Sequence, residues 1–283
     1  MTTALEVPTS PKPTTTVRDS VWRGLAAKGA RSILAVAGAI AAIVIVWTLF
    51  LRVVNVSPFV AKSPADVWTY LFTDPEAVGN RAVIASNLLR TLIDASYGYA
   101  LGLVLAATVS LLFYFSRVLE SMFVPSVTAL HAIPMVTVAP ILVLIFGRGV
   151  LGTAVIGASI VFVPALLTML LGIRSTPRTD VDMIVAFGGS TASAFFKVAL
   201  PHAIPTWFTA ARVAVTTSVV GALLAEWLAT GKGLGGQMLK DANEFEFARL
   251  WASVVVLTVV CVALYQVMSI IEGIVTNRLK AAQ

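Results

Sequence analysis

A few of the ionisable and hydroxyl side chains inside the long apolar runs of this 283-residue chain are the candidates for binding a solute. They are His131, Arg212, Glu226 and three consecutive hydroxyl residues, Thr216, Thr217 and Ser218. A charged side chain at the centre of a bilayer costs about 2.5 to 3.5 kcal/mol on insertion scales, so it should face protein or water. We assign His131 and the three hydroxyls to a candidate solute path and interpret Arg212 and Glu226 as structural. The alternatives are a buried hydrogen-bonding role for His131, and hydroxyls that bond only to their own helix.

A polar interruption between two apolar runs has a distinctive spacing. Asp182 is followed six residues later by Gly188, and a Val-Ala-Leu-Pro sequence ends at Leu200 and Pro201. Glycine permits a tight turn, so we expect two short helices hinged at Gly188, with Ser190 as the N-cap of the second. Pro201 is expected to end this segment and start the turn into the next apolar run.

Several large apolar residues of the same polar interruption should not face water. They are Met183, Phe187, Phe195 and Phe196. Exposed apolar side chains in such numbers are unfavourable in water, so some of them should dock on another protein or against the membrane domain.

Other motifs are weaker. The glycine-rich sequence from Gly231 to Gly236 lacks the order of a phosphate-binding loop and predicts a turn. Cys261 is the only cysteine, so the chain can form no internal disulfide and no cysteine metal cluster is indicated. We predict no metal site and no catalytic residues.

The composition indicates a membrane protein. Hydrophobic residues make up 58% of the chain and charged residues 12%, far from the average of soluble domains. The net charge is +6, but the basic residues are scattered between apolar runs instead of clustering with aromatics, which argues against nucleic-acid binding.

Six apolar segments are long enough to cross a bilayer, because a helix needs about 20 apolar residues to span it. They cover approximately residues 32–51, 92–115, 122–146, 151–171, 204–228 and 250–275. The predicted fold is therefore an all-α polytopic membrane protein with six transmembrane helices. Residues 1–31, rich in Thr, Pro and Ser, are predicted to be a disordered tail. Residues 276–283 form a second tail, and residues 172–203 form the polar interruption within the membrane domain of residues 32–275.

The distribution of basic residues predicts the orientation. With both termini in the cytoplasm, eleven of the 20 Lys and Arg residues lie inside, eight lie outside and Arg212 lies within a span. This bias follows the positive-inside rule and places the Asp182 interruption in the cytoplasm.

The second predicted span carries packing signals. Gly98, Gly102, Ala106 and Ser110 form a stripe of small residues that lets another helix approach closely, either in the same chain or in a second copy. Arg90 and Asp94 lie one helical turn apart and can pair.

The third span contains Pro125, Pro134 and Pro140, so we expect a broken or kinked helix there.

The residues from Asp182 to Pro201 resemble the cytoplasmic EAA loop of type I binding-protein-dependent ABC importer permeases. In that family an acidic residue, a glycine six residues later and a hydrophobic-x-Leu-Pro sequence stand at these spacings. Asp182 replaces the usual glutamate, and Met183 with Ile184 replaces the usual alanine pair. The sequence from His131 to Pro134, and Glu226 followed by a Gly-Leu-Gly turn, are similar to the same family. Within it, the chain looks most like the nitrate, taurine, sulfonate and thiamine-precursor group.

The resemblance implies a function and a set of partners. The chain would be the permease subunit of an ATP-driven importer in a bacterial-type inner membrane, moving a small polar or anionic solute. Its partners would be ABC ATPase subunits, a second permease copy and an extracytoplasmic solute-binding protein. ATP and Mg would bind to the ATPase, with no cofactor on this chain. The residues that couple to the ATPase would be Asp182, Met183, Phe187, Gly188, Leu200 and Pro201.

Two other classes of membrane protein fit the sequence less well. An ion-coupled secondary transporter commonly shows internal repeats and charges at the midplane, and the sequence shows no convincing repeat and few central charges. A membrane-embedded enzyme would need a metal or nucleophile constellation, which is not recognisable here.

Overall fold

The structure is a computed structural model that describes residues 38–281, and every regular element in that range is helical. The chain divides into two compact units, residues 1–64 and 65–283. The described part of the first unit contains one apolar helix, Gly38–Val54. The predicted tail of residues 1–31 and the start of the first predicted span lie outside the described residues.

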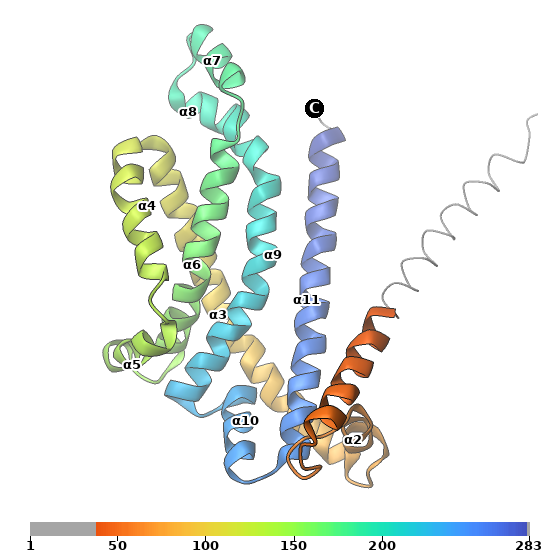
Figure 1. Ribbon diagram of the computed structural model, residues 1–283. Helices are drawn as coiled ribbons and strands as arrows, with labels where there is room; N and C mark the ends of the chain where they lie inside the picture. Colours follow the sequence, from red (N-terminus) through yellow and green to blue (C-terminus); the bar gives the residue numbers. More distant parts are fainter. Residues whose placement is uncertain (1–37, 282–283) are drawn as a thin grey trace, which may run out of the picture. The chain divides into compact units, whose positions relative to one another are not determined.

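The second unit is built on four long apolar helices (Figure 1). They are α3 (Ala77–Phe115), α6 (Val150–Arg174), α9 (Leu200–Ala225) and α11 (Phe247–Ala281). α9 continues into the π-helical turn η3 (Glu226–Thr230). Each of the four is long and apolar enough to cross a membrane, which confirms the predicted spans at 92–115, 151–171, 204–228 and 250–275.

The third predicted span is broken, as its prolines predict. The third is a helix pair, α4 (Arg117–His131) and α5 (Met135–Phe146), bent by 103° at a short break. The break coincides with Pro134, the N-cap of α5, because proline disfavours a helical conformation in the residue before it. Within the described residues, the first predicted span is represented by the apolar helix Gly38–Val54. The described residues thus contain four single spans, one bent pair and the apolar helix Gly38–Val54.

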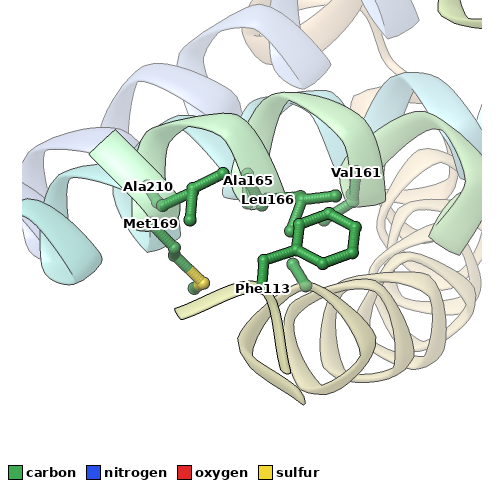
Figure 2. Close-up of a cluster of buried hydrophobic side chains, with 9 residues drawn as sticks. Phe113, Val161, Ala165, Leu166, Met169 and Ala210 are labelled. Atoms are coloured by element: carbon green, nitrogen blue, oxygen red, sulfur yellow. The ribbon is translucent and has the colours of Figure 1, made fainter. Parts of the chain in front are cut away.

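Close packing of α3, α6 and α9 forms the core of the second unit. One cluster of buried side chains joins Phe113 of α3, Leu166 and Met169 of α6, and Ala210 of α9 (Figure 2). α11 packs against α9, and α10 (Gly233–Asn243) packs against α3 and α11.

The predicted stripe of small residues faces α6 of the same chain. Gly98 meets Gly157, Gly102 meets Val161, and Ala106 and Ser110 are fully buried. The absence of side chains at these glycines lets the two helix backbones approach closely. The stripe is therefore an intramolecular packing surface. Arg90 and Asp94 form the expected ion pair, with 3.6 Å between Nε and Oδ2.

The two ends of the second unit carry different elements (Figure 1). The short helices α7 (Arg178–Ala186) and α8 (Thr191–Ala194) project from one end, where α11 also ends, and α10 lies at the opposite end. The short helix α2 (Pro64–Trp68) and the π-helical turn η1 (Thr69–Thr73) precede α3.

Candidate functional site

The segment between α6 and α9 forms the two short helices that the sequence predicts. Gly188 lies in the turn between them with φ +84°, a conformation that residues with side chains rarely adopt. Its N–H donates to the Val185 carbonyl at 2.9 Å, and the N–H of Gly189 donates to the Ile184 carbonyl at 2.9 Å. Ser190 is the N-cap of α8, since its hydroxyl accepts a hydrogen bond from the Ser193 N–H at 3.2 Å. The hinge and the cap are confirmed.

Pro201 does not end this segment, contrary to the prediction. α8 runs through the π-helical turn η2 (Phe195–Ala199) directly into α9, giving one continuous helix from Thr191 to Thr230. Leu200 donates its N–H to the Phe195 carbonyl five residues back, and Pro201 follows in the first turn of α9. Proline lacks an N–H donor, and the wider π-helical turn directly before Pro201 makes room for its ring within the continuous helix.

The apolar residues of this segment divide into one anchor and several exposed groups. Phe195 is 1% exposed and packs against Tyr114 and Phe115 of α3, with ring centroids 4.8 and 5.3 Å apart. Met183, Phe187 and Phe196 are 55%, 87% and 63% exposed. We name the residues 178–199 the α7–α8 segment. It is fixed to the helical core at Phe195 and presents an apolar surface outward.

The other three predicted coupling residues differ in exposure. They are Asp182, Leu200 and Pro201. Asp182 is exposed on α7. Leu200 packs in part against the buried cluster of Ile173, Phe195, Ala199 and Ala203, and Pro201 beside it is half-buried. Asp182 therefore lies with the exposed apolar groups, while the Leu-Pro pair belongs to the attachment to the core.

His131 lines a cavity of about 580 Å³ at the bend between α4 and α5. α6 and α9 complete its walls, with Phe162 on one and Val220 on the other. The lining is mostly apolar, and Ser159 is a second polar residue in it, although its hydroxyl is bonded to the Val155 carbonyl. The broken helix thus borders a cavity, as irregular backbone at membrane depth requires.

The three hydroxyl residues of α9 bond to their own helix. Thr216 and Thr217 donate to the Val213 carbonyl at 3.1 and 3.0 Å, and Ser218 donates to the Val215 carbonyl at 2.7 Å. None of the three lines the His131 cavity. The structure therefore does not bring them together with His131, and their hydrogen bonds fit the alternative structural role.

Glu226 is fully buried and joins three elements. Its Oε1 accepts a hydrogen bond from the Thr91 hydroxyl of α3 at 2.7 Å, and its Oε2 accepts one from the Gly235 N–H of α10 at 2.7 Å. The Leu234 N–H completes the cluster by donating to the Thr91 hydroxyl at 2.8 Å. Only part of the glycine-rich sequence forms the predicted turn, because α10 begins at Gly233 and its free N–H groups are held by Glu226 and Thr91.

Arg212 pairs with an acidic residue that the sequence analysis did not single out. Its Nε lies 3.1 Å from Oε2 of Glu272 on α11, and its guanidinium lies 5.1 Å from the centre of the Tyr265 ring. Thr209 donates to the other Glu272 oxygen at 2.7 Å. Glu272 could have been found from the sequence, because it is an acidic residue within the last apolar run. In the described residues, Arg212 and Glu226 both bond to neighbouring helices, which fits their predicted structural role.

Comparisons with known proteins identify the family. Residues 98–281 match the family described as binding-protein-dependent transport system inner membrane component. The chain is 27% identical to a probable ABC transporter permease protein of Haemophilus influenzae, over 79% of this chain and 89% of the relative. It is 25% identical to the formylaminopyrimidine transport permease protein ThiX of Halalkalibacterium halodurans, over 82% of this chain and 90% of the relative.

A solved structure shares the fold. A crystal structure described as an amino acid ABC transporter with histidines aligns with a TM-score of 0.54 and 15% identity, covering 71% of this chain and 96% of the other. Since the family match covers most of the chain, and the relatives are transport permeases and not enzymes, this multi-pass chain belongs to the inner-membrane permease components of binding-protein-dependent ABC importers.

Proposed function

We propose that this subunit is driven by ABC ATPase subunits that dock on the α7–α8 segment. The observation that carries the proposal is the division of that segment into an anchor and an exposed apolar surface. Met183, Phe187 and Phe196 are more than half exposed, which is unfavourable unless another protein covers them. Asp182 adds a negative charge on α7, next to Met183.

The anchor explains how movement would reach the membrane helices. Phe195 packs on α3, and the helix that contains it continues without a break into α9. A displacement of the α7–α8 segment would therefore act on both spans at once. Gly188 fixes the angle between α7 and α8, and Leu200 with Pro201 joins the segment to α9. ATP and Mg would bind to the ATPase, and this chain would supply no cofactor.

The solute path would run along the bend between α4 and α5. The His131 cavity is the support for this assignment, because it opens at a broken helix among the spans. Two copies of the subunit would enclose the path, and an extracytoplasmic binding protein would deliver a small polar or anionic solute. A cavity of about 350 Å³ at the end that carries α10 is lined by Arg90, Arg148 and Lys232 with Asp94, and this charge excess favours an anion.

The end that carries the α7–α8 segment would face the cytoplasm, together with both termini. Arg117, Arg174 and Arg178 lie at that end, in agreement with the positive-inside rule. Cysteine labelling of intact cells tests this orientation. An Asp74→Cys variant should react with a membrane-impermeant reagent, and an Asp180→Cys variant should react only after lysis.

Capture of the ATPase tests the docking proposal. We expect Phe187→Asp to reduce co-purification of the ATPase by about tenfold or more, because a charge replaces the most exposed apolar group of the segment. Phe245→Asp is the matched control, since Phe245 is 65% exposed between α10 and α11, at the opposite end. Equal ATPase capture by both variants and the unmodified chain would refute the proposal. Native mass spectrometry of the assembly should show two copies of this subunit.

A further inference from the structure

A second cavity, of about 390 Å³, lies where α4 begins, α6 ends and the α7–α8 segment leaves the core. Its polar lining comes from five helices and the loop between two of them: Tyr114, Arg117, Arg174, Thr176, Arg178, Asp182 and Thr191. An adjacent cavity of about 510 Å³ is lined by the same three arginines together with Glu120. Three guanidinium groups from α4, α6 and α7 therefore border one space.

Only one of the three arginines has partners in the described residues. Arg174 forms an ion pair with Glu120 and donates to the Phe113 carbonyl at 3.2 Å. The side chains of Arg117 and Arg178 form no ion pair or hydrogen bond with any residue in the range 38–281, although both residues line the cavity. The acidic groups that face the two cavities are Asp182 and Glu120, and Glu120 is engaged by Arg174. The space keeps an excess of positive charge with two free guanidinium groups.

Thr176 adds an independent polar group to this space. Its side chain lines the cavity and is only 9% exposed, and its hydroxyl has no hydrogen-bond partner among the described residues. A buried hydroxyl without a hydrogen-bond partner is unfavourable. A ligand that offers acceptor oxygens next to Thr176 would remove that cost.

We propose that this cavity binds a phosphate group, held by Arg117 and Arg178 with the Thr176 hydroxyl as a further donor. The planar fork of a guanidinium matches phosphate oxygens in a bidentate manner, and these charge-assisted bonds are about twice as strong as neutral ones. The phosphate comes either from a phospholipid headgroup or from a free phosphate compound. Bound there, it links α4 and α6 to α7 and holds the α7–α8 segment against the core. Binding of the ligand would thus control the position of the α7–α8 segment. Phosphate binding itself does not depend on any ATPase.

Thermal stability of the full-length permease in lipid nanodiscs tests the site. We expect either inorganic phosphate to stabilise the protein in neutral phosphatidylcholine discs, beyond chloride at equal ionic strength, or anionic phosphatidylglycerol discs to stabilise it without added phosphate. The first result identifies a free phosphate compound as the source, and the second identifies a lipid headgroup. In both cases the Arg117→Gln/Arg178→Gln double variant should lose the response, and the Arg278→Gln variant, changed at an exposed residue of α11, should keep it.

Thr176→Val keeps the test independent of misfolding. Valine has nearly the same shape and removes the unpartnered hydroxyl, so the variant should fold normally and bind phosphate about tenfold more weakly. No response of the unmodified protein to phosphate or phosphatidylglycerol would overturn the proposal. An equal response from the double variant would also overturn it. The unmodified protein could also show no response to phosphate or phosphatidylglycerol while the double variant loses ATPase capture. That result would show that the two arginines contact the ATPase instead of a phosphate group.

Discussion

Gly98 of α3 and Gly157 of α6 meet backbone to backbone, since a Cβ atom added to Gly98 would lie 2.7 Å from the Cα atom of Gly157. Gly157 also meets α9, because a Cβ atom on Gly221 would lie 2.7 Å from the same Cα atom. The three central helices therefore cross at glycines, and their spacing is set by the absence of side chains there.

Gly98→Ala should destabilise the subunit, because backbone atoms cannot move aside as a flexible side chain can. We expect a loss of about 1 to 3 kcal/mol, typical of overpacking, measured as a lower unfolding temperature in detergent. Gly79→Ala is the control on the same helix, where an added Cβ atom meets nothing within 4 Å. It should be neutral or slightly stabilising, given the helix propensity of alanine. Equal melting temperatures for the two variants would contradict the crossing.

Gly188→Val should abolish uptake while the subunit remains inserted in the membrane. The φ of +84° at Gly188 is strongly unfavourable for a β-branched residue, so the angle between α7 and α8 must change. Gly188→Asn should retain much more activity, because asparagine tolerates the left-handed region. An added Cβ atom at Gly188 meets nothing within 4 Å, so both effects arise from the backbone. Measured uptake and solute-stimulated ATP hydrolysis should be lost only in the valine variant; equal rates in both would contradict this role.

The sequence predicts the apolar spans better than their breaks and partners. The length of the apolar runs predicted the membrane-crossing parts of α3, α6, α9 and α11. The predicted span began near residue 92, whereas α3 starts at Ala77, because a helix can extend beyond its apolar stretch. Proline predicted a broken third span without locating the break. Pro125 and Pro140 lie inside α4 and α5, and only Pro134 stands at the bend.

Long-range partners could not be predicted, because a single sequence does not show which helices are neighbours. The packing role of Gly98 was visible from its spacing, but its contact with Gly157 was not. Glu226 and Arg212 were recognised as unusual at membrane depth, whereas Thr91 and Glu272 became their partners only in the fold. Within the α7–α8 segment, local rules predicted the hinge at Gly188 and the cap at Ser190, since both depend on near neighbours.

Removal of one partner of the Arg212–Glu272 pair should harm the subunit more than removal of both. Arg212→Met leaves the Glu272 carboxylate half-buried among spans without its cation, and a broken buried pair typically costs about 3 to 5 kcal/mol. The Arg212→Met/Glu272→Leu double variant leaves no uncompensated charge and should recover part of that loss. Unfolding temperatures of the single and double variants measure the difference. A double variant less stable than Arg212→Met would contradict this account.

Glu226→Gln should loosen α10 from α3, because Glu226 accepts hydrogen bonds from both helices at once. An amide offers a single acceptor oxygen, so one of the two donors, the Thr91 hydroxyl or the Gly235 N–H, would face an NH₂ group. A buried donor left without a partner costs about 1 to 3 kcal/mol. Hydrogen exchange at the backbone of α10 should rise several-fold, while exchange in α7, at the other end, should not change.

A double-mutant cycle with Thr91→Val separates this contact from general destabilisation. The Thr91 hydroxyl donates to Glu226 and accepts from the Leu234 N–H, so the two residues act within one network. We expect a coupling free energy of about 0.5 to 3 kcal/mol between Thr91→Val and Glu226→Gln, the range for residues that share hydrogen bonds. Glu244→Gln, at an exposed carboxylate paired only with Lys240, is the control and should leave α10 unchanged. Additive effects of Thr91→Val and Glu226→Gln would show that the buried carboxyl group does not hold α10 through Thr91.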